Sequence, residues 1–454
     1  MENIKNRISP IGQLPSETLA HTATFFAKER DLINATAVCR HWRTTCLSYP
    51  LLWRNAGGSS SEIQAYLERS GSTTLDVELS HPSLVDLIAP HFYRLVGLTV
   101  RSDEPSSLSE FGYHLRHPIP TLHTFRISVN GGRYDPRLEF PLDLRNPSFS
   151  HVKKLELKGF LTPWDYEFPY VTELVLDTSP TGSTNRILKT LEQFPALEKV
   201  HITFRREMEP VFHVDVTTLP HVREMSLSMF KTIVFPPRLP TIFVSLRLPN
   251  LTSLRIQTSG NVMARRIALP LQTFYDRLPN FAELPELQVK MGNSSPELTL
   301  RSTSQATLKY LPGKWDYDRL GREVWGGLPL DSVQRMTVDM VHRPSDRKFQ
   351  WFIVLLRDLK CLEHLELDGE CEDAIQWLYR EMKEGTRSLP IQTLTVRCGE
   401  QVRRQALRLK RLADAAGLTT TLVRVPDPEA YKKGEVEMDP EGSCDEPEGE
   451  AGSG

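Results

Sequence analysis

"VKKLEL", at residues 152–157, carries the pattern that decides the fold of this chain. Leu155 and Leu157 alternate with charged residues, which is typical of a β-strand that buries one face and exposes the other. Val152, three positions upstream of Leu155, adds a further apolar residue before the strand. The stretch "LEHLEL" at residues 362–367 has the same pattern. We therefore predict that both stretches are strands built in the same way.

The pattern recurs along most of the chain, at spacings of 19 to 30 residues with one gap of 82 residues. A strand of this kind with a period of about 20–30 residues is typical of leucine-rich repeats, in which stacked units share one core. The predicted strands lie at 98–100, 125–127, 155–157, 174–176, 200–202, 225–227, 254–256, 336–338, 365–367, 394–396 and 422–425, with 287–289 and 298–300 as candidates inside the gap. Amphipathic patterns predict connecting helices at 187–194, 348–359, 374–382 and 401–416.

We therefore predict an α/β repeat with a parallel sheet. The Asn or Cys that usually follows the strand is mostly absent, and the repeat lengths are uneven. The solenoid is accordingly expected to be irregular.

Exposed positions on the predicted strands are polar or charged, and they would form one face. A protein partner could bind this face, or the face could simply be solvated, as any exposed sheet face is. The candidate partner-binding residues of this face are Lys154, Glu156, Lys158, His201, Arg255, Arg335, His364, Glu366 and Arg397.

The N-terminal stretch LPSETLAHTATFFAKERDLINATAVCRHWRTTCLSYPLLW, residues 14–53, predicts three short helical segments. Pro15 suits a first helical position, and Asp31 suits the N-cap of a second helix. Pro50 would end that helix and begin a third turn that closes at Trp53. About forty residues are too few to bury all the apolar groups of this stretch. We therefore expect the segment to pack against a partner.

The order and spacing of these residues resemble the F-box, a helical module that docks on the Skp adaptor of a cullin–RING ubiquitin ligase. Thr18 and Thr22 stand where that family usually has aliphatic residues. The alternative is that this segment is an ordinary three-helix start of a larger domain. The resemblance implies that the adaptor contacts are Leu14, Pro15, Glu17, Leu32, Val38, Trp42, Leu51 and Trp53.

The repeats resemble the leucine-rich array of one branch of F-box proteins, in which the array holds the protein to be ubiquitinated. This resemblance implies a non-catalytic substrate receptor whose partners are the Skp adaptor, a cullin and an unknown protein substrate. Two alternatives stay open: a repeat scaffold that works without a ligase, and an enzyme whose site is assembled from distant residues.

Composition argues against several other classes of protein. The net charge of −2 gives no basic field for nucleic acid or membrane. The longest apolar run, residues 351–356, is too short to cross a bilayer, and the N-terminus lacks the apolar segment of a signal peptide. The six cysteines form no CxxC pair. We expect a cytoplasmic or nuclear protein.

No motif predicts catalysis, a cofactor or a metal. His114, His117 and His123 are close in sequence, but Pro118 interrupts any helix there and no Cys or carboxylate stands at ligand spacing. Phosphate-binding glycine loops and nucleophile elbows are absent from the sequence. We therefore expect no catalytic, metal or cofactor residues.

We predict five regions along the chain. They are a flexible N-terminus (1–8), the F-box module (9–56), a connector or first capping repeat (57–85), the repeat array (86–426) and a disordered acidic tail (427–454). The connector is expected to hold a short helix around residues 63–67 and a strand at 75–79.

The tail holds ten Asp or Glu residues against two Lys. Removing its charge of −8 from the total of −2 leaves +6 on the rest. The predicted helix before it is basic, so the tail could mask that helix, or it could serve only to keep the chain in solution. The basic residues are Arg403, Arg404, Arg408, Lys410 and Arg411.

Overall fold

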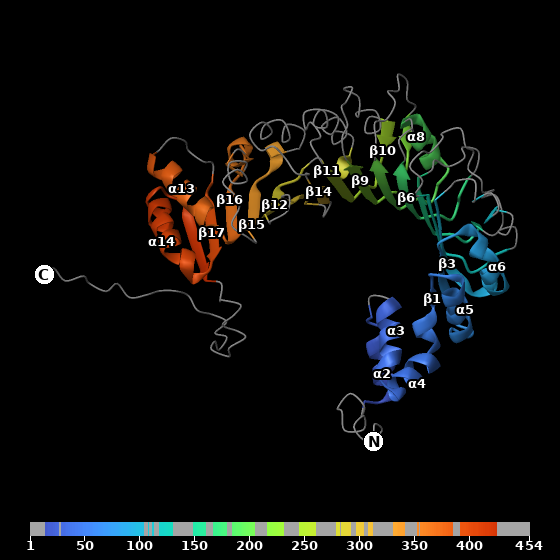
Figure 1. Cartoon of the computed structure of the whole chain (residues 1–454). Helices are drawn as coiled ribbons and strands as arrows, with labels where there is room; N and C mark the ends of the chain where they lie inside the picture. The colour runs from blue at the N-terminus through green and yellow to red at the C-terminus, as the bar shows by residue number, and fades with distance from the viewer. Residues whose placement is uncertain are drawn as a thin grey trace, which may run out of the picture. The chain divides into compact units, whose positions relative to one another are not determined.

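The structure is a computed structural model that forms two compact units (Figure 1). The first unit comprises Met1–Pro285 and Glu297–Ser332, and the second comprises Glu286–Pro296 and Val333–Gly454. The residues described are 14–26, 29–103, 108, 111–112, 118–129, 149–159, 167–178, 184–204, 216–230, 245–259, 278–281, 283–291, 297–303, 307–311, 330–340, 352–353, 355–384 and 391–424.

The first unit begins with three helices and a short 3-10 helix, which we call the N-terminal module together with the strand β1 that follows. They are α2 (Ser16–Ala23), α3 (Glu29–Val38), α4 (Arg40–Ser48), η2 (Pro50–Trp53) and β1 (Asn55–Ala56). The three helices match the predicted helical start, but the prediction of one helix from Asp31 to Tyr49 is wrong. The backbone is extended at Cys39, which separates α3 from α4, and Asp31 lies inside α3. The Arg43 side chain satisfies the end of α3 by donating from Nε to the Thr36 carbonyl oxygen at 2.9 Å.

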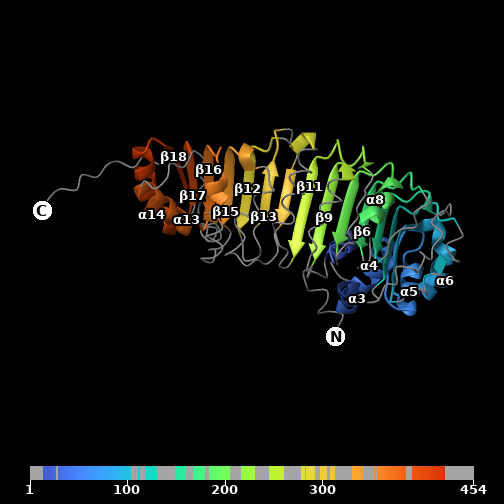
Figure 2. The ribbon, with the colours of Figure 1, turned by 90° about the horizontal axis from the view of Figure 1, so that it is seen from above.

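A mostly parallel sheet follows the module in the first unit (Figure 2). Its strands, in spatial order, are β1, β2 (Leu75–Leu79), β3 (Leu95–Ser102), β4 (Thr124–Val129), β5 (Lys154–Lys158), β6 (Glu173–Thr178), β7 (Lys199–Phe204), β9 (Glu224–Phe230), β11 (Ser253–Ser259), β14 (Thr307–Leu311) and β13 (Glu297–Arg301). A separate parallel pair consists of β8 (Thr217–Thr218) and β10 (Leu246–Arg247). Helical connections include α5 (Ser60–Arg69), η3 (Pro82–Leu84), α6 (Val85–Ile88), η4 (Ala89–Arg94), α8 (Thr184–Glu192), η6 (Pro279–Phe281) and η7 (Leu330–Ser332).

Among the residues described, the second unit has a five-stranded parallel sheet, the helices α13 (Glu372–Glu384) and α14 (Glu400–Ala415), and helical residues at 352–353 and 355–358, within the helix predicted at 348–359. The strands, in spatial order, are β12 (Glu286–Met291), β15 (Arg335–Met340), β16 (His364–Gly369), β17 (Thr393–Cys398) and β18 (Thr419–Arg424). The helices α13 and α14 connect β16 to β17 and β17 to β18. They pack against each other, and α14 also packs on β17 and β18 (Figures 1 and 2).

The alternation read in the sequence is the alternation of burial in the structure. Leu155 and Leu157 are buried, and so are Leu365 and Leu367. The upstream residue Val152 is buried too, and its amide donates to the Phe149 carbonyl oxygen in a tight turn before β5. The core of each unit is therefore built from the apolar positions of the motif.

One backbone hydrogen bond recurs at the start of successive strands. The amide of the residue before a strand donates to the carbonyl oxygen of the equivalent residue one strand earlier, at 2.8 to 3.0 Å. These bonds use main-chain atoms only, so they join neighbouring strands regardless of side chain. The donor and acceptor pairs are Lys153 and His123, Thr172 and Lys153, Glu198 and Thr172, Arg223 and Glu198, Thr252 and Arg223, Glu363 and Gln334, and Gln392 and Glu363; at β18 the donor is the first residue of the strand, Thr419, and the acceptor is Gln392.

All the predicted strand positions that the structure describes are in strands, but two details are wrong. The segment at 298–300, predicted as a repeat strand, pairs antiparallel with β14, and β14 itself was not predicted. The last strand begins at Thr419 and not at Leu422. The helices at 187–194, 374–382 and 401–416 correspond to α8, α13 and α14. Outside the described residues lie the predicted N-terminus and acidic tail, His114, His117, and residues 348–351 and 354 of the helix predicted at 348–359.

Candidate adaptor-docking site

The N-terminal module has its own small core, in which α4 packs against both α2 and α3. Leu19 of α2, Cys46 of α4 and Trp53 of η2 are fully buried. The Phe26 ring stacks on Trp42 at 6.2 Å between ring centroids. Burial raises the pKa of the Cys46 thiol, as expected for a small side chain that serves packing. The module therefore folds around residues that the sequence also offered as partner contacts.

Trp53 ties this core to the rest of the first unit. Its indole N–H donates to the Cys46 carbonyl oxygen at 2.8 Å. The ring meets Tyr66 of α5 edge-on at 5.0 Å between centroids, and the Arg69 guanidinium lies 4.4 Å from the ring centroid. A cation over an indole face is attracted to it. One aromatic side chain thus contacts both the module and the helix that follows.

The strand β1 continues this connection directly into the sheet. It begins two residues after Trp53 and pairs in parallel with β2, with Asn55 opposite Asp76. The Asp76 amide also donates to the Arg54 carbonyl oxygen at 2.9 Å. The module is therefore joined to the first strands by paired backbone and not by a long linker.

Three of the eight predicted adaptor contacts lie inside the protein. Leu32 and Trp42 are 6% and 7% exposed, and Trp53 is 0% exposed. In this structure these three side chains are part of the protein core and not of its surface. The reason is physical: a module of about forty residues has few large apolar side chains and uses them for its own core. The other five predicted contacts, which are exposed, are Leu14, Pro15, Glu17, Val38 and Leu51.

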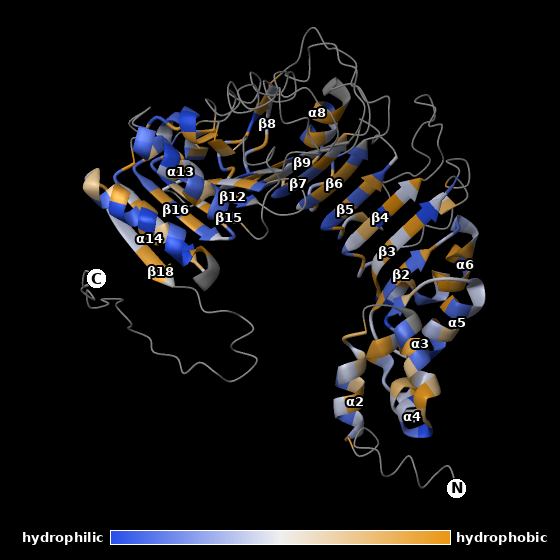
Figure 3. Ribbon diagram, turned by 60° about the vertical axis from the view of Figure 1, so that its left-hand side comes forward, coloured by the Kyte–Doolittle hydropathy of each residue, from blue (hydrophilic) through white to orange (hydrophobic). Residues whose placement is uncertain are grey.

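Exposed apolar side chains are concentrated on the module. Of the twelve large apolar residues exposed among the described residues, seven lie between positions 14 and 51. Phe25 is 72% exposed and Val38 is 65% exposed. Orange segments on α2 and α4 mark the apolar residues of the module in Figure 3. Because contiguous exposed apolar patches mark interaction sites, the concentration of such residues on one small module makes the module a candidate docking surface. The seven residues, which we call the apolar surface set, are Leu14, Phe25, Ile33, Val38, Leu47, Tyr49 and Leu51.

Sequence reasoning missed four members of this set: Phe25, Ile33, Leu47 and Tyr49. For Phe25, the sequence does contain an indication that the side chain is exposed. Phe25 and Phe26 are adjacent, so only one of the two rings can face the core of the module, and Phe26 is the one that reaches Trp42. Phe25 instead meets His21 edge-on at 5.1 Å between ring centroids.

Thr18 and Thr22, the two departures from the usual F-box pattern, are both exposed on α2. The Thr22 hydroxyl donates to the Thr18 carbonyl oxygen at 2.8 Å. This surface of α2 is consequently more polar than an aliphatic pair would make it.

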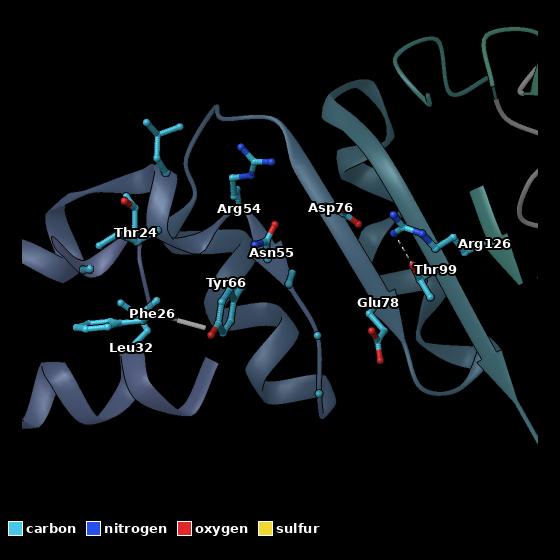
Figure 4. Close-up of a pocket in the computed structure, with 16 residues that line it drawn as sticks. Thr24, Phe26, Leu32, Arg54, Asn55, Tyr66, Asp76, Glu78, Thr99 and Arg126 are labelled. Carbon is cyan, nitrogen blue, oxygen red and sulfur yellow. Dashed lines mark hydrogen bonds between the residues drawn. The ribbon is translucent and has the colours of Figure 1, made fainter. Parts of the chain in front are cut away.

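A cavity of about 720 Å³ lies where the module meets the sheet (Figure 4). Phe26 and Leu32 line it from the module, and Asp76 and Glu78 line it from β2. Figure 4 shows Arg126 of β4 at the strand side, donating to the Thr99 hydroxyl at 3.4 Å. The described lining contains no histidine, cysteine or lysine, so the cavity has a mixed surface without a nucleophile–base pair.

The predicted partner-binding residues of the first unit share one face of its sheet. Glu156 is in register with Arg126 and, two strands further, with His201, while Arg255 is in register with Ser226 next to it. Most charges on this face pair with a neighbouring charge. The ion pairs are Arg101 with Glu78, Arg126 with Glu156, Lys154 with Glu173, Lys158 with Glu156, and Lys199 with Glu224.

The second unit carries the other four predicted face residues on its own sheet. Arg335 pairs with Glu286 at 2.7 Å, and Arg397 pairs with Glu366 at 2.6 Å. His364 contacts the Thr393 hydroxyl on the next strand. Charges on this face are therefore also largely balanced by neighbours.

His201, on the predicted face, has a lowered pKa. Burial lowers its pKa below 6.5, and the positive charge of Arg255 lowers it further. Asp177 and Glu156 act in the opposite direction, and Lys158 adds a small lowering effect. His201 is therefore neutral at pH 7 in the folded chain.

This shift predicts a pH effect on stability. The unfolded chain takes up a proton at His201 near its ordinary pKa of 6.5, whereas the folded chain resists it. The contribution of His201 to stability is thus present above that pKa and is lost as the pH falls below it. We expect His201→Gln to reduce the decrease in melting temperature between pH 7.5 and pH 5.5. An equal decrease in His201→Gln and the wild type would contradict this prediction.

Comparison with known proteins bears on the N-terminal module alone. Residues 11–57, about a tenth of the chain, match the family described as F-box-like. The resemblance of this segment to the F-box is thereby confirmed. No curated protein matches the chain. An F-box-like domain implies binding to a Skp adaptor and suggests the role of a substrate receptor in a ubiquitin ligase.

The described residues form neither a metal centre nor a membrane-spanning helix. They contain no group of three or more His, Cys, Asp or Glu side chains arranged to hold a metal ion. None of the described helices combines the length and apolar character needed to cross a membrane.

Proposed function

We propose that this protein is the substrate-recognition subunit of a Skp–cullin–F-box ubiquitin ligase. The N-terminal module would bind the Skp adaptor, and the sheet would hold a protein substrate. The chain would contribute no chemistry of its own. It would raise the effective concentration of the substrate beside the ubiquitin-loaded conjugating enzyme.

The observation that carries this proposal is the apolar surface set on a module that matches the F-box-like family. Seven exposed apolar side chains within 38 residues are more than a solvated module needs. The paired strand β1 supports the proposal further, because it holds the module against the first strands of the sheet. A receptor that acts by proximity gains from such a connection.

We propose that the sheets are an irregular leucine-rich-repeat array and that their polar face binds the substrate. The recurring backbone bond and the buried apolar positions support this assignment. The division into residues 9–56, 57–85 and 86–426, and localisation in the cytoplasm or nucleus, belong to the same proposal. Arg255 is the clearest candidate contact, since it is exposed and forms no ion pair with any described residue.

The test is co-purification of the full chain with a Skp adaptor. We expect the wild type to form a stable complex and a Val38→Asp, Leu51→Asp double variant to lose it. Each change places a charge on an exposed apolar side chain, and a hot-spot residue contributes about 2 kcal/mol or more to binding. The expected loss of affinity is therefore at least about a hundredfold.

A matched control is available outside the module, where Tyr93 of η4 is 63% exposed and Tyr170, in the turn before β6, is 60% exposed. Tyr93→Asp with Tyr170→Asp adds the same two charges to exposed residues and should leave the complex intact. Equal melting temperatures would show that all variants are folded. A wild-type chain that does not bind the adaptor at micromolar concentrations would refute the ligase proposal.

That negative result would favour a second function, a repeat scaffold that binds partners without a ligase. The observation behind it is the exposed Thr18 and Thr22 pair on α2, which reduces the apolar area that the module can offer. Thr18→Leu with Thr22→Leu distinguishes the two, because it should restore adaptor binding only if the module is a weakened F-box.

A further inference from the structure

A groove of about 510 Å³ lies between α13 and α14 in the second unit. Ile375 and Tyr379 form its apolar part. Gln376 and Gln405 approach each other at 3.4 Å, and Gln405 also donates to Glu372 at 2.7 Å, which fixes the two helices side by side. Both helices show long blue, hydrophilic stretches in Figure 3.

The charged side chains along the groove are mostly positive. Arg380 and Lys383 come from α13 and Arg408 from α14, against the single carboxylate of Glu384. All three cations are exposed. Beyond the groove, α14 carries the further cations Arg404, Lys410 and Arg411.

These cations differ from most of those on the strand faces in having no charge partner. Lys154, Lys199, Arg335 and Arg397 each pair with a glutamate on a neighbouring strand. Among the described residues, no ion pair is formed by the six cations Arg380, Lys383, Arg404, Arg408, Lys410 and Arg411, whereas a seventh, Arg403 of α14, has an interaction partner. Charges on the strand faces are thus mostly paired, whereas the groove has three unpaired cations and one carboxylate.

The segment with the complementary charge is the end of this same chain. Residues 427–454 carry a net charge of −8. They follow β18, which ends at Arg424 and packs against α14. Thirty residues can span up to about 100 Å, whereas the whole of α14 is about 24 Å long. The acidic segment can therefore reach every cation of the groove.

We propose that the groove between α13 and α14 binds the acidic C-terminal segment of the same chain, residues 427–454. The carboxylates of the segment would supply the partners that Arg380, Lys383 and Arg408 lack. Such a contact places an internal ligand over the groove, which an acidic protein would have to displace. The inference does not depend on the ligase proposal, since the second unit alone carries it.

The test measures binding of a synthetic peptide of residues 427–454, labelled on its single cysteine, Cys444. Its main receptor is the full chain with all ten tail carboxylates replaced by amides, so that no internal ligand competes. We expect this chain to bind the peptide at least about tenfold more tightly than the wild type does, because a tethered segment competes at millimolar effective concentration. Binding should weaken as salt rises from about 0.05 to 0.3 M.

Charge reversal in the groove locates the site. We expect Arg380→Glu, Lys383→Glu and Arg408→Glu, made together in the amide-tail chain, to weaken peptide binding by at least about tenfold. The control makes the same three-charge change at exposed cations of the first unit. These changes, Lys189→Glu, Arg223→Glu and Arg247→Glu, should leave the affinity within about twofold.

Three results would overturn the proposal. The first is no peptide binding to the amide-tail chain, which would leave the groove to an acidic partner. The second is equal binding to the amide-tail and wild-type chains, which would show that the native segment does not occupy the groove. The third is equal loss in the groove variant and the control variant, which would mean general charge attraction. Matching melting temperatures establish that each variant is folded.

Discussion

Trp53→Ala is expected to destabilise the first unit by about 3–5 kcal/mol, the usual cost of truncating a fully buried tryptophan. The change leaves a cavity between the module and α5, and it removes the edge-on contact with Tyr66 and the cation–π contact with Arg69. Thermal unfolding of the full chain, followed by circular dichroism, should show a lower melting temperature for the first unit. Amide exchange should become faster in α5 and β1.

Trp53→Phe is the matched control, because it keeps an aromatic ring and removes the hydrogen bond to the Cys46 carbonyl oxygen. Its cost should be smaller, since a net hydrogen bond contributes about 0.5–1.5 kcal/mol and the lost ring volume adds a modest cavity. An unchanged melting temperature of the first unit in Trp53→Ala would contradict the claim that Trp53 stabilises this unit. Adaptor binding would also fall in Trp53→Ala, but through unfolding, in contrast to the folded Val38→Asp, Leu51→Asp variant.

Gly369→Ala is expected to have the second large effect. Gly369 ends β16 with φ at +80°, and a Cβ placed there would lie 2.4 Å from the Met340 carbonyl oxygen on β15. That oxygen already accepts the Glu370 amide at 2.8 Å, so it has little freedom to move. The strand end must therefore shift, and the second unit should lose stability.

Gly417→Ala isolates the steric part of this effect. Gly417 has nearly the same φ, +84°, but a Cβ there would meet nothing within 4 Å. It should cost about 1–2 kcal/mol from the left-handed backbone alone. Gly369→Ala should cost about 1–3 kcal/mol more, as overpacked sites do. Equal shifts of the second unit's unfolding transition in denaturant would show that the contact with Met340 is unimportant.

The strands could be predicted from the sequence because their signal is local. Alternation at Leu155 and Leu157 needs only neighbouring residues, and burial of that face follows from it. The direction of a strand is not local information. The pattern at 298–300 is the same in a parallel or an antiparallel strand, so the reversal of β13 could not be predicted.

The site was predicted less completely, for a related reason. A motif places Trp53 at the right position but does not say whether the ring faces the module's own core or a partner. Only the packing of α5 against η2 shows that it faces inward. Ion pairs such as Lys154 with Glu173 could have been predicted, because both residues immediately precede the first leucine of their strands and parallel register brings such positions together.

The recurring backbone bond before each strand bears on how this sequence can diverge. Its donors include lysine, threonine, glutamate, arginine and glutamine, and only proline would be excluded, because it lacks the amide hydrogen. At the buried strand positions, an aliphatic side chain is enough to fill the core. Substitutions can therefore accumulate across the sheets while the fold persists, whereas the compact module must keep particular residues such as Trp53. In such a chain the module is the part whose family can still be recognised from the sequence, and it is the part that matches a known family.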